Sequence, residues 1–477
     1  MMNLIRDRFI MALNLRLKRA DVDMTSGNIF RHIIGFALPL FVGNLFQLLY
    51  NMVDAWVVGN YVSNEAFSAV GTVGTIINML IGFFSGLATG AGVVISQYYG
   101  AKQESEVKKA VHTSILMTLA LGVIFTALGI FMTPLMLRLM KTPGDVVGEA
   151  TTYLLIYFAG LLGLMLYNMG AGILRAVGDS RHPFYYLVVC AVLNTVLDLT
   201  FVLVFHMGVA GVALATIIAE FVSAALILLC LARSKSVVRL RLADMKISWK
   251  ILWKIVRIGF PAGIQVAITA FSNVFVQSYI NHFGKDVMSG HTAYGKIDSI
   301  ISQLLQSIEM AVTTFVGQNL GVSQVKRAKD GIRTGVIVSA VVTVIIGVPI
   351  MIFAPYAVAF FNPVPAVVEA GTTILRILTP FFLIYGFYEI LVGALRGAGN
   401  STAPMIITLS TFVGFRQVYL YVMSNFISND LITIFMGFPI SWTVCMIILY
   451  IYYKRTPLDK KRIIDLPDTE DAPEKVH

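Results

Sequence analysis

Charged side chains are scarce in this sequence. Asp, Glu, Lys and Arg make up 13% of its 477 residues, whereas soluble domains contain about a quarter. Hydrophobic residues make up 57%, and the mean hydropathy is +0.79. The apolar residues form runs of about twenty, the length that crosses a hydrocarbon core roughly 30 Å thick. This composition excludes an ordinary soluble protein and predicts a polytopic helical membrane protein.

The chain also lacks patterns that would indicate disulfides, metal sites or catalysis. Its three cysteines, Cys190, Cys230 and Cys445, lie in separate apolar runs, so we interpret them as small core residues. The seven histidines show no metal-ligand spacing, and no nucleotide-binding loop, nucleophile motif or intramembrane protease signature occurs. We therefore expect no enzyme activity and no cofactor. Without an ATP site, uphill transport would require an ion gradient.

Twelve apolar runs lie between charged, Gly, Pro or Asn breaks and are candidate membrane spans. Their approximate bounds are 33–59, 67–98, 110–137, 149–174, 184–205, 209–232, 252–282, 290–317, 332–355, 370–395, 403–424 and 431–453. With the N-terminus inside, segments on the inner side hold 30 of the 36 Lys and Arg residues. This asymmetry follows the positive-inside rule and predicts that both termini are cytoplasmic. Topology thus explains the net charge of +10, and a nucleic-acid partner is not needed.

The two halves of the chain resemble each other at an offset of 221 residues. The matching residues of the first half are Tyr167, Gly172, Leu174, Arg175, Gly178, Ser180 and Pro183; their counterparts are Tyr388, Gly393, Leu395, Arg396, Gly399, Ser401 and Pro404. Gln97, Gly100 and Lys108 recur likewise as Gln318, Gly321 and Lys329. Each half would hold six spans, so both enter the membrane in the same orientation. Channels and scaffolds can also arise by duplication, but two six-span lobes favour alternating access.

We therefore predict an all-α membrane protein with two pseudo-symmetric six-helix lobes. The predicted segments are a cytoplasmic N-terminal segment (1–32), an N-lobe (33–232), a cytoplasmic linker (233–250), a C-lobe (251–453) and a cytoplasmic tail (454–477).

The first span carries one polar stripe. Asn44, Gln47, Asn51 and Asp54 are spaced three, four and three residues apart, so on a helix they share one face. A membrane-embedded aspartate is costly to bury as an anion and rarely faces lipid. Two interpretations are open: a buried carboxyl that joins helices, or a proton- or cation-binding site in a transport pathway.

Other polar residues of the first half could reach the same cavity. Asn194 and Asp198 are four residues apart in the fifth span, and Thr216 lies in the sixth. Two carboxylates in a site of low dielectric cannot both stay ionised at low cost. Alternatively, the Asn and Thr oxygens could help to coordinate a monovalent cation. The spacing leaves proton and sodium open. Asn168 in the fourth span is a further polar candidate.

Proline and glycine mark two further features of the N-lobe. Pro39 interrupts the first span, where it either makes a plain kink or forms a bending element coupled to Asp54. The glycine-rich stretch at 82–92 is interpreted as a close helix-packing surface.

The C-lobe has different polar groups. Arg416 in the eleventh span needs a partner at membrane depth, and the sequence offers Asp298 and Glu389 as candidates for a structural ion pair. Arg175 and Arg396 end the fourth and tenth spans, where we interpret them as interfacial anchors.

Several motifs in combination resemble the multidrug and toxic compound extrusion transporters, over essentially all twelve spans. They are Ala37-Leu38-Pro39 followed by Gln47, Tyr50 and Val53-Asp54; the turn Gln97-Tyr98-Tyr99-Gly100-Ala101; and the twin segments 174–180 and 395–401. The resemblance implies a V-shaped pair of six-helix lobes that exports cationic amphipathic drugs in exchange for protons or sodium.

The branch that this chain resembles, related to DNA-damage-inducible transporters, implies particular site residues. Its ion-coupling residues match Asp54, Asn194, Asp198 and Thr216, its bending proline matches Pro39, and its drug-contacting glutamine matches Gln47. With the stripe and its neighbours, we predict substrate contacts at Gln47, Tyr50, Asn51 and Asn168. Another large branch has an acidic cation site partly on span seven, where this chain has no acid. That difference favours the N-lobe and leaves Asp298, Glu389 and Arg416 as C-lobe candidates.

The leading hypothesis is a multidrug exporter of small organic cations, coupled to H⁺ or Na⁺ and acting as a monomer in the bilayer of a prokaryotic inner membrane. An alternative is a flippase for lipid-linked substrates, which would need a large basic cavity. A passive channel is a third possibility.

Overall fold

A computed structural model of the chain describes residues 21–140, 142–458 and 462–464, so most of the predicted N-terminal segment and part of the tail lie outside the described residues. Twelve helical segments of the described chain are long and apolar enough to cross a membrane, which confirms the predicted number. The spans of the first repeat are α2 (Ile29–Tyr61), α3 (Asn64–Gly100), α4 (Glu104–Leu139), α5 (Val147–Ala176), α6 (Arg181–Leu199) with the π-helical turn Thr200–Val204, and α7 (Gly208–Arg233).

The second repeat has the same order of spans. They are α8 (Trp249–Asn281), α9 (Lys285–Gly321), α10 (Val325–Ile352), α12 (Pro365–Leu378) continued by α13 (Phe382–Gly397), α14 (Thr402–Thr408) continued by α15 (Arg416–Val422), and α16 (Leu431–Arg455). A short extra helix, α11 (Ala354–Phe361), precedes the tenth span. The eleventh span contains π-helical segments at Leu409–Phe415 and Met423–Ile427. Most helices extend a few residues beyond the predicted spans, because helical hydrogen bonding continues past the last apolar residue.

Side-chain caps define where three of the spans begin. Asn28, Ser63 and Asp430 accept hydrogen bonds from the backbone N–H groups of Arg31, Ala66 and Thr433. Each cap satisfies a donor that the first helical turn leaves without a partner.

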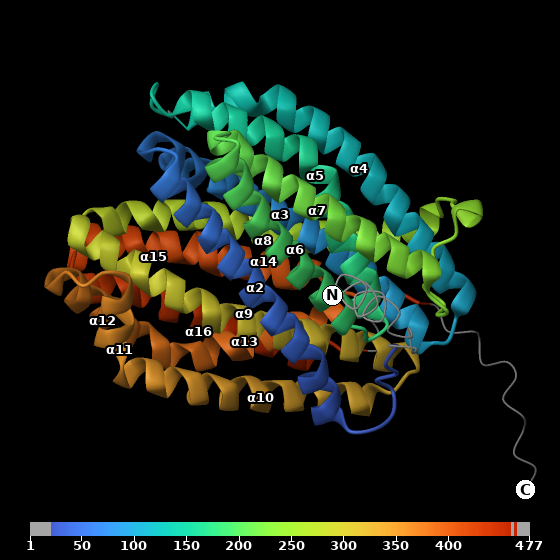
Figure 1. The fold of residues 1–477 in the computed structure, drawn as a ribbon. Coiled ribbons are helices and arrows are strands. Elements are labelled where there is room, and N and C mark those ends of the chain that lie inside the picture. The colour runs from blue at the N-terminus through green and yellow to red at the C-terminus, as the bar shows by residue number, and fades with distance from the viewer. Residues whose placement is uncertain (1–20, 141, 459–461, 465–477) are drawn as a thin grey trace, which may run out of the picture.

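The first helix of each repeat packs partly into the opposite lobe. Ile33, Phe36 and Leu40 of α2 belong to the hydrophobic core of the second repeat. Conversely, Ile251 and Ile255 of α8 belong to a core of the first repeat. Figure 1 shows α2 running obliquely across the boundary between the blue-green and the yellow-red halves. The two lobes are therefore joined by exchanged half-helices as well as by the linker.

Glycines allow α3 and α8 to touch backbone to backbone. A Cβ atom on Gly90 would lie 2.5 Å from the nitrogen of Gly259, and a Cβ on Gly86 would collide with the backbone of Gly263. Backbones can approach this closely only where side chains are absent. This contact confirms the interpretation of the 82–92 stretch as a packing surface.

Adding a methyl group at this contact should destabilise the fold. We expect Gly90→Ala to lower the free energy of unfolding by about 1–3 kcal/mol, because a backbone must move to admit the Cβ. Gly71→Ala in the same helix is the control, since a Cβ there meets nothing within 4 Å. Thermal unfolding in detergent measures both, and an unchanged melting temperature for Gly90→Ala would contradict the packing argument.

Two repeat-related glutamines connect the lobes near the ends of α3 and α9. Gln97 Nε2 donates to the carbonyl of Gly397 at 2.9 Å, and Gln318 Nε2 donates to the carbonyl of Ala176 at 3.0 Å. Both donors and both acceptors are 221 residues apart, so the two bonds are pseudo-symmetric copies. Gly100 and Gly321 bring the same helix ends together, each against the backbone at the opposite glutamine.

The chain segments outside the spans close over this junction. The N–H of Met24 donates to Gln318 Oε1 at 2.9 Å, and the N–H of Ile463 donates to Gln97 Oε1 at 3.0 Å. Arg327 NH2 donates to the carbonyl of Met24 at 3.1 Å. The lobes are therefore held together at the end of the molecule where both terminal segments lie.

Candidate functional site

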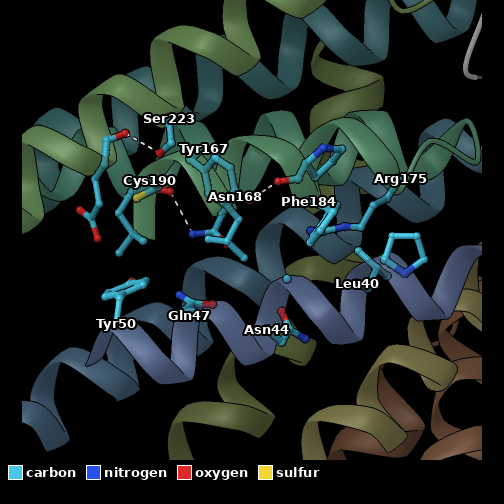
Figure 2. Close-up of a pocket in the computed structure, with 16 residues that line it drawn as sticks. Leu40, Asn44, Gln47, Tyr50, Tyr167, Asn168, Arg175, Phe184, Cys190 and Ser223 are labelled. Atoms are coloured by element: carbon cyan, nitrogen blue, oxygen red, sulfur yellow. Dashed lines mark hydrogen bonds between the residues drawn. The ribbon is translucent and has the colours of Figure 1, made fainter. Parts of the chain in front are cut away.

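A polar cavity lies inside the N-lobe, between α2, α5, α6 and α7. Its volume is about 70 Å³, enough for about two water molecules and well below the ~300 Å³ of a drug-binding pocket. Figure 2 shows Asn44, Gln47 and Tyr50 of α2 facing Tyr167 and Asn168 of α5 across this space. A drug-sized ligand would therefore require the helices that line the cavity to move apart.

Most of the predicted substrate contacts reach this cavity. Gln47, Tyr50 and Asn168 line it, as does Pro39. Asn168 Nδ2 donates to the carbonyl of Leu164 at 2.9 Å. Asn51 differs, because it is exposed and does not line the cavity. The α-helix continues unbroken through Pro39.

Asn44 joins the polar stripe to the opposite lobe. It lines the cavity, and its Nδ2 donates to Ser307 Oγ of α9 at a long distance of 3.5 Å. The wall formed by α2 thus contacts both the N-lobe cavity and the C-lobe.

Two aspartates from different helices meet beyond Tyr50. Asp54 of α2 and Asp198 of α6 are 6% and 0% exposed, and their carboxyl groups lie close enough to influence each other directly. Apart from this mutual contact, Asp54 Oδ1 and both carboxyl oxygens of Asp198 have no hydrogen-bond partner in the described part of the chain. Buried carboxylates without a compensating charge are costly. The pair therefore requires a proton or a cation.

Asn194 and Thr216 complete this coupling cluster (Asp54, Asn194, Asp198 and Thr216). Asn194 Nδ2 donates to Thr216 Oγ1 at 3.4 Å, and Thr216 in turn donates to the carbonyl of Val212 at 3.0 Å. Asn194 Oδ1 is buried without a partner among the described residues. The structure brings together all four residues predicted for ion coupling. Their free oxygens suit either a shared proton or a small monovalent cation.

The C-lobe has no equivalent pair of free carboxyls around Arg416. The predicted ion pair of Arg416 with Asp298 or Glu389 is wrong. Arg416 Nε donates to Ser441 Oγ at 2.9 Å, and the guanidinium lies over the rings of Phe412 and Phe438 at 4.8 and 4.6 Å. Aromatic faces stabilise a cation without an anion. Phe412 lies four residues before Arg416 on the same span, whereas Phe438 comes from another helix and could not be inferred from that spacing.

Asp298 and Glu389 have separate surroundings. Asp298 Oδ1 accepts a hydrogen bond from Tyr294 on its own helix at 3.1 Å. Glu389 is 9% exposed and lies near Tyr385. Neither makes an ion pair with an arginine of the described chain, so the structure adds no geometric support for a C-lobe ion site.

Arg396 is more than an interfacial anchor. Its NH1 pairs with Glu309 Oε1 at 3.4 Å, and its NH2 donates to Gln265 Oε1 at 3.0 Å. The equivalent Arg175 of the N-lobe instead lines the polar cavity. For Arg396, these buried polar contacts correct the interpretation as a plain anchor.

Glu220 is a site residue that the sequence predictions omitted. It lines the cavity beside Tyr50, is 7% exposed, and its Oε2 has no hydrogen-bond partner among the described residues. Its spacing of four residues from Thr216 on one helix face was the available signal. Asp54 and Asp198 already accounted for the predicted ion site. The spacing alone therefore did not show whether Glu220 belongs to the site or has a structural role.

Comparison with known proteins gives a consistent picture. The MatE family profile matches residues 39–200 and again residues 261–422, one match in each repeat. The probable multidrug resistance protein YpnP of Bacillus subtilis is 30% identical over 91% of this chain and 97% of that protein. The probable multidrug resistance protein NorM of Thermotoga maritima is 27% identical over 85% and 88% of the two chains.

A solved structure shares the fold. A MOP superfamily transporter from Pyrococcus furiosus superposes with a TM-score of 0.86 at 23% identity, over 91% of this chain and 97% of that chain. The two profile matches together cover more than half of the sequence. The chain therefore belongs to the MatE family, the multidrug and toxic compound extrusion transporters.

Proposed function

We propose that this protein is a multidrug exporter that couples the outward movement of cationic amphipathic compounds to the inward movement of H⁺ or Na⁺. The observation that carries the proposal is the buried Asp54–Asp198 pair with its unpartnered oxygens, four residues along α2 from the substrate cavity. The relatives named as multidrug resistance proteins support it. We place the protein in the plasma membrane with both termini cytoplasmic, as the distribution of Lys and Arg predicts.

The same helix links the two binding events. Gln47 and Tyr50 of α2 face the cavity, and Asp54 faces Asp198. An ion that loads the aspartates removes their mutual repulsion and changes the packing of α2 against α6. An ion and a drug are coupled when they compete for one site or prefer different conformations. A shift of α2 would change both sites at once and would therefore couple ion binding to drug binding. Pro39 provides a point at which the helix lacks one backbone hydrogen bond.

Alternating access then requires the lobes to separate at the junction formed by Gln97 and Gln318. In the described conformation this junction is closed. With the termini in the cytoplasm, the closed end is cytoplasmic and substrate would leave toward the outside.

Drug-dependent ion flux in proteoliposomes tests the function and identifies the ion. A pH gradient and a sodium gradient are imposed one at a time, each directed opposite to the expected movement of ethidium. We expect one of the two gradients to drive ethidium against its own concentration gradient. The gradient that does so names the coupling ion. Ethidium that equilibrates under both gradients without accumulating would instead indicate a passive channel. An organic cation that is not moved at all would favour the flippase alternative.

A further inference from the structure

The segment before α2 bridges the two lobes. In this N-strap (residues 21–28), the N–H of Val22 donates to the carbonyl of Val177 in the N-lobe at 2.9 Å. Two residues later, the N–H of Met24 donates to Gln318 Oε1 of the C-lobe at 2.9 Å. The side chain of Met24 is buried in the core of the second repeat. The N-strap therefore has one anchor on each side of the closed junction.

The segment after the last span makes a similar bridge at the other glutamine. In this C-strap (residues 462–464), the N–H of Ile463 donates to Gln97 Oε1 of the N-lobe at 3.0 Å. The side chain of Ile463 packs against a core of the first repeat. Its neighbour Arg462 donates from NH1 to Ser323 Oγ of the C-lobe at 2.6 Å. The C-strap is thus also anchored on both lobes.

Each junction glutamine binds a strap and the opposite lobe with the two ends of one carboxamide. Gln318 accepts from the N-strap through Oε1 and donates through Nε2 to the carbonyl of Ala176. Gln97 accepts from the C-strap through Oε1 and donates through Nε2 to the carbonyl of Gly397. A side-chain amide that is bonded at both ends cannot rotate without breaking a bond. The straps therefore fix the orientation of the two groups that join the lobes.

Charged and amide groups of the C-lobe hold the N-strap firmly. Asn319 Nδ2 donates to the carbonyl of Met24 at 3.2 Å. Arg327 donates to the same carbonyl from Nε at 3.3 Å and from NH2 at 3.1 Å, and its NH2 also donates to the carbonyl of Ser26 at 2.8 Å. Hydrogen bonds from a charged group are stronger than those between neutral groups. When the lobes separate, we expect the N-strap to stay on the C-lobe and to part from Val177.

We propose that the N-strap and the C-strap are latches that hold this end of the transporter closed. Both straps must release one lobe before Gln97 and Gln318 can separate from the opposite lobes. The latches thereby make the closed junction the resting conformation and set how often it opens. This inference goes beyond the proposed export function, because it concerns the movement of the lobes and not the identity of the ion or the substrate.

The reaction of a buried cysteine with N-ethylmaleimide measures opening of the junction. Ser96 is 1% exposed and lies at the contact between α3 and α9, so Ser96→Cys reacts only when this contact opens. The labelling rate therefore follows the population of the opened junction. The experiment uses the full-length chain in lipid nanodiscs, which leave both membrane faces accessible to the reagent. Alanine replaces the native cysteines.

Arg327→Gln removes the charged anchor of the N-strap. It should raise the labelling rate of Ser96→Cys about tenfold, the size expected for losing hydrogen bonds from one charged group. Arg462→Gln removes the Ser323 contact of the C-strap and should raise the rate about threefold, because that contact is exposed. Lys329→Gln is the matched control on an exposed residue of α10, and its rate should stay within about twofold of the parent protein.

A second reporter separates release of a latch from loosening of the whole fold. Cys445 is buried in the C-lobe core, so a protein that retains only this native cysteine reacts when the lobe itself unfolds. Arg327→Gln should leave the labelling rate of Cys445 unchanged. An equal rise at Ser96→Cys and Cys445 would mean that Arg327 only stabilises the fold, and an unchanged rate at Ser96→Cys in both strap variants would mean that the straps do not restrain the junction. Either result would overturn the proposal and leave the export function untouched.

Discussion

Asp54→Asn should abolish drug accumulation against a gradient. Asparagine keeps the shape of the side chain but can neither release a proton near neutral pH nor supply the negative charge that a sodium ion requires. The neighbouring Asp198 then faces a neutral amide in place of a carboxyl partner. The coupled cycle loses its ion, and only passive equilibration of the drug remains.

The size of this effect follows from the driving force. A tenfold concentration gradient of the coupling ion provides about 1.4 kcal/mol for each ion moved. When one ion exchanges for one drug cation, no net charge moves, and this gradient sustains a roughly tenfold concentration ratio of the drug. We expect the Asp54→Asn variant to lose this ratio entirely in proteoliposomes and to confer no drug resistance in cells.

Asp145→Asn is the matched control for Asp54→Asn, because Asp145 is exposed in the connection between α4 and α5. It should transport like the wild type. Size-exclusion chromatography of both variants in detergent would show whether they fold. Normal resistance conferred by a correctly inserted Asp54→Asn protein would refute the coupling role of this carboxyl.

A disulfide between Ser96→Cys and Gly317→Cys should stop transport reversibly. A Cβ on Gly317 would lie 3.2 Å from the Cβ of Ser96 across the junction of α3 and α9, slightly closer than the 3.5–4.5 Å typical of disulfides. A small shift of either helix would accommodate the bond. Because alternating access requires this junction to open, oxidation should reduce turnover to background, and dithiothreitol should restore it.

The controls for this cross-link are the two single-cysteine variants, which cannot form the bond. All of them are made in a background whose native Cys190, Cys230 and Cys445 are replaced by alanine and whose transport is verified first. Full turnover by a protein shown by mass spectrometry to be cross-linked would mean that this junction does not separate during the cycle.

The candidate coupling cluster was largely predictable because its residues share helix faces. The spacing of Asn194 and Asp198 places both on one side of α6, and the polar stripe of α2 must avoid lipid. The partner of Arg416 was not predictable in this way. Ser441 and Phe438, both on α16, supply two of its three contacts, and charge pairing in sequence gives no information about aromatic faces from another helix.

The surroundings of the two repeat-related arginines were likewise not predictable from the sequence. Sequence identity between Arg175 and Arg396 suggested equal roles for the two repeats. Their environments differ, because a carboxylate faces one arginine at Glu309 and an alanine, Ala88, occupies the equivalent position near the other. Only the packing of α3 and α9 against α5 and α13 revealed this asymmetry.

By itself, the sequence determined that this is a twelve-span membrane protein built from two copies of one six-span unit. Those properties follow from the length of the apolar runs and from identities between the two halves of the chain. Both can be read from the order of the residues without knowing which helices touch. Only the tertiary structure decided that half of α2 packs in the opposite lobe, that Gln97 and Gln318 close one end, and that Glu220 and Arg175 share a cavity. Those properties depend on which helix faces meet, and helix contact is set by the shapes of all side chains together.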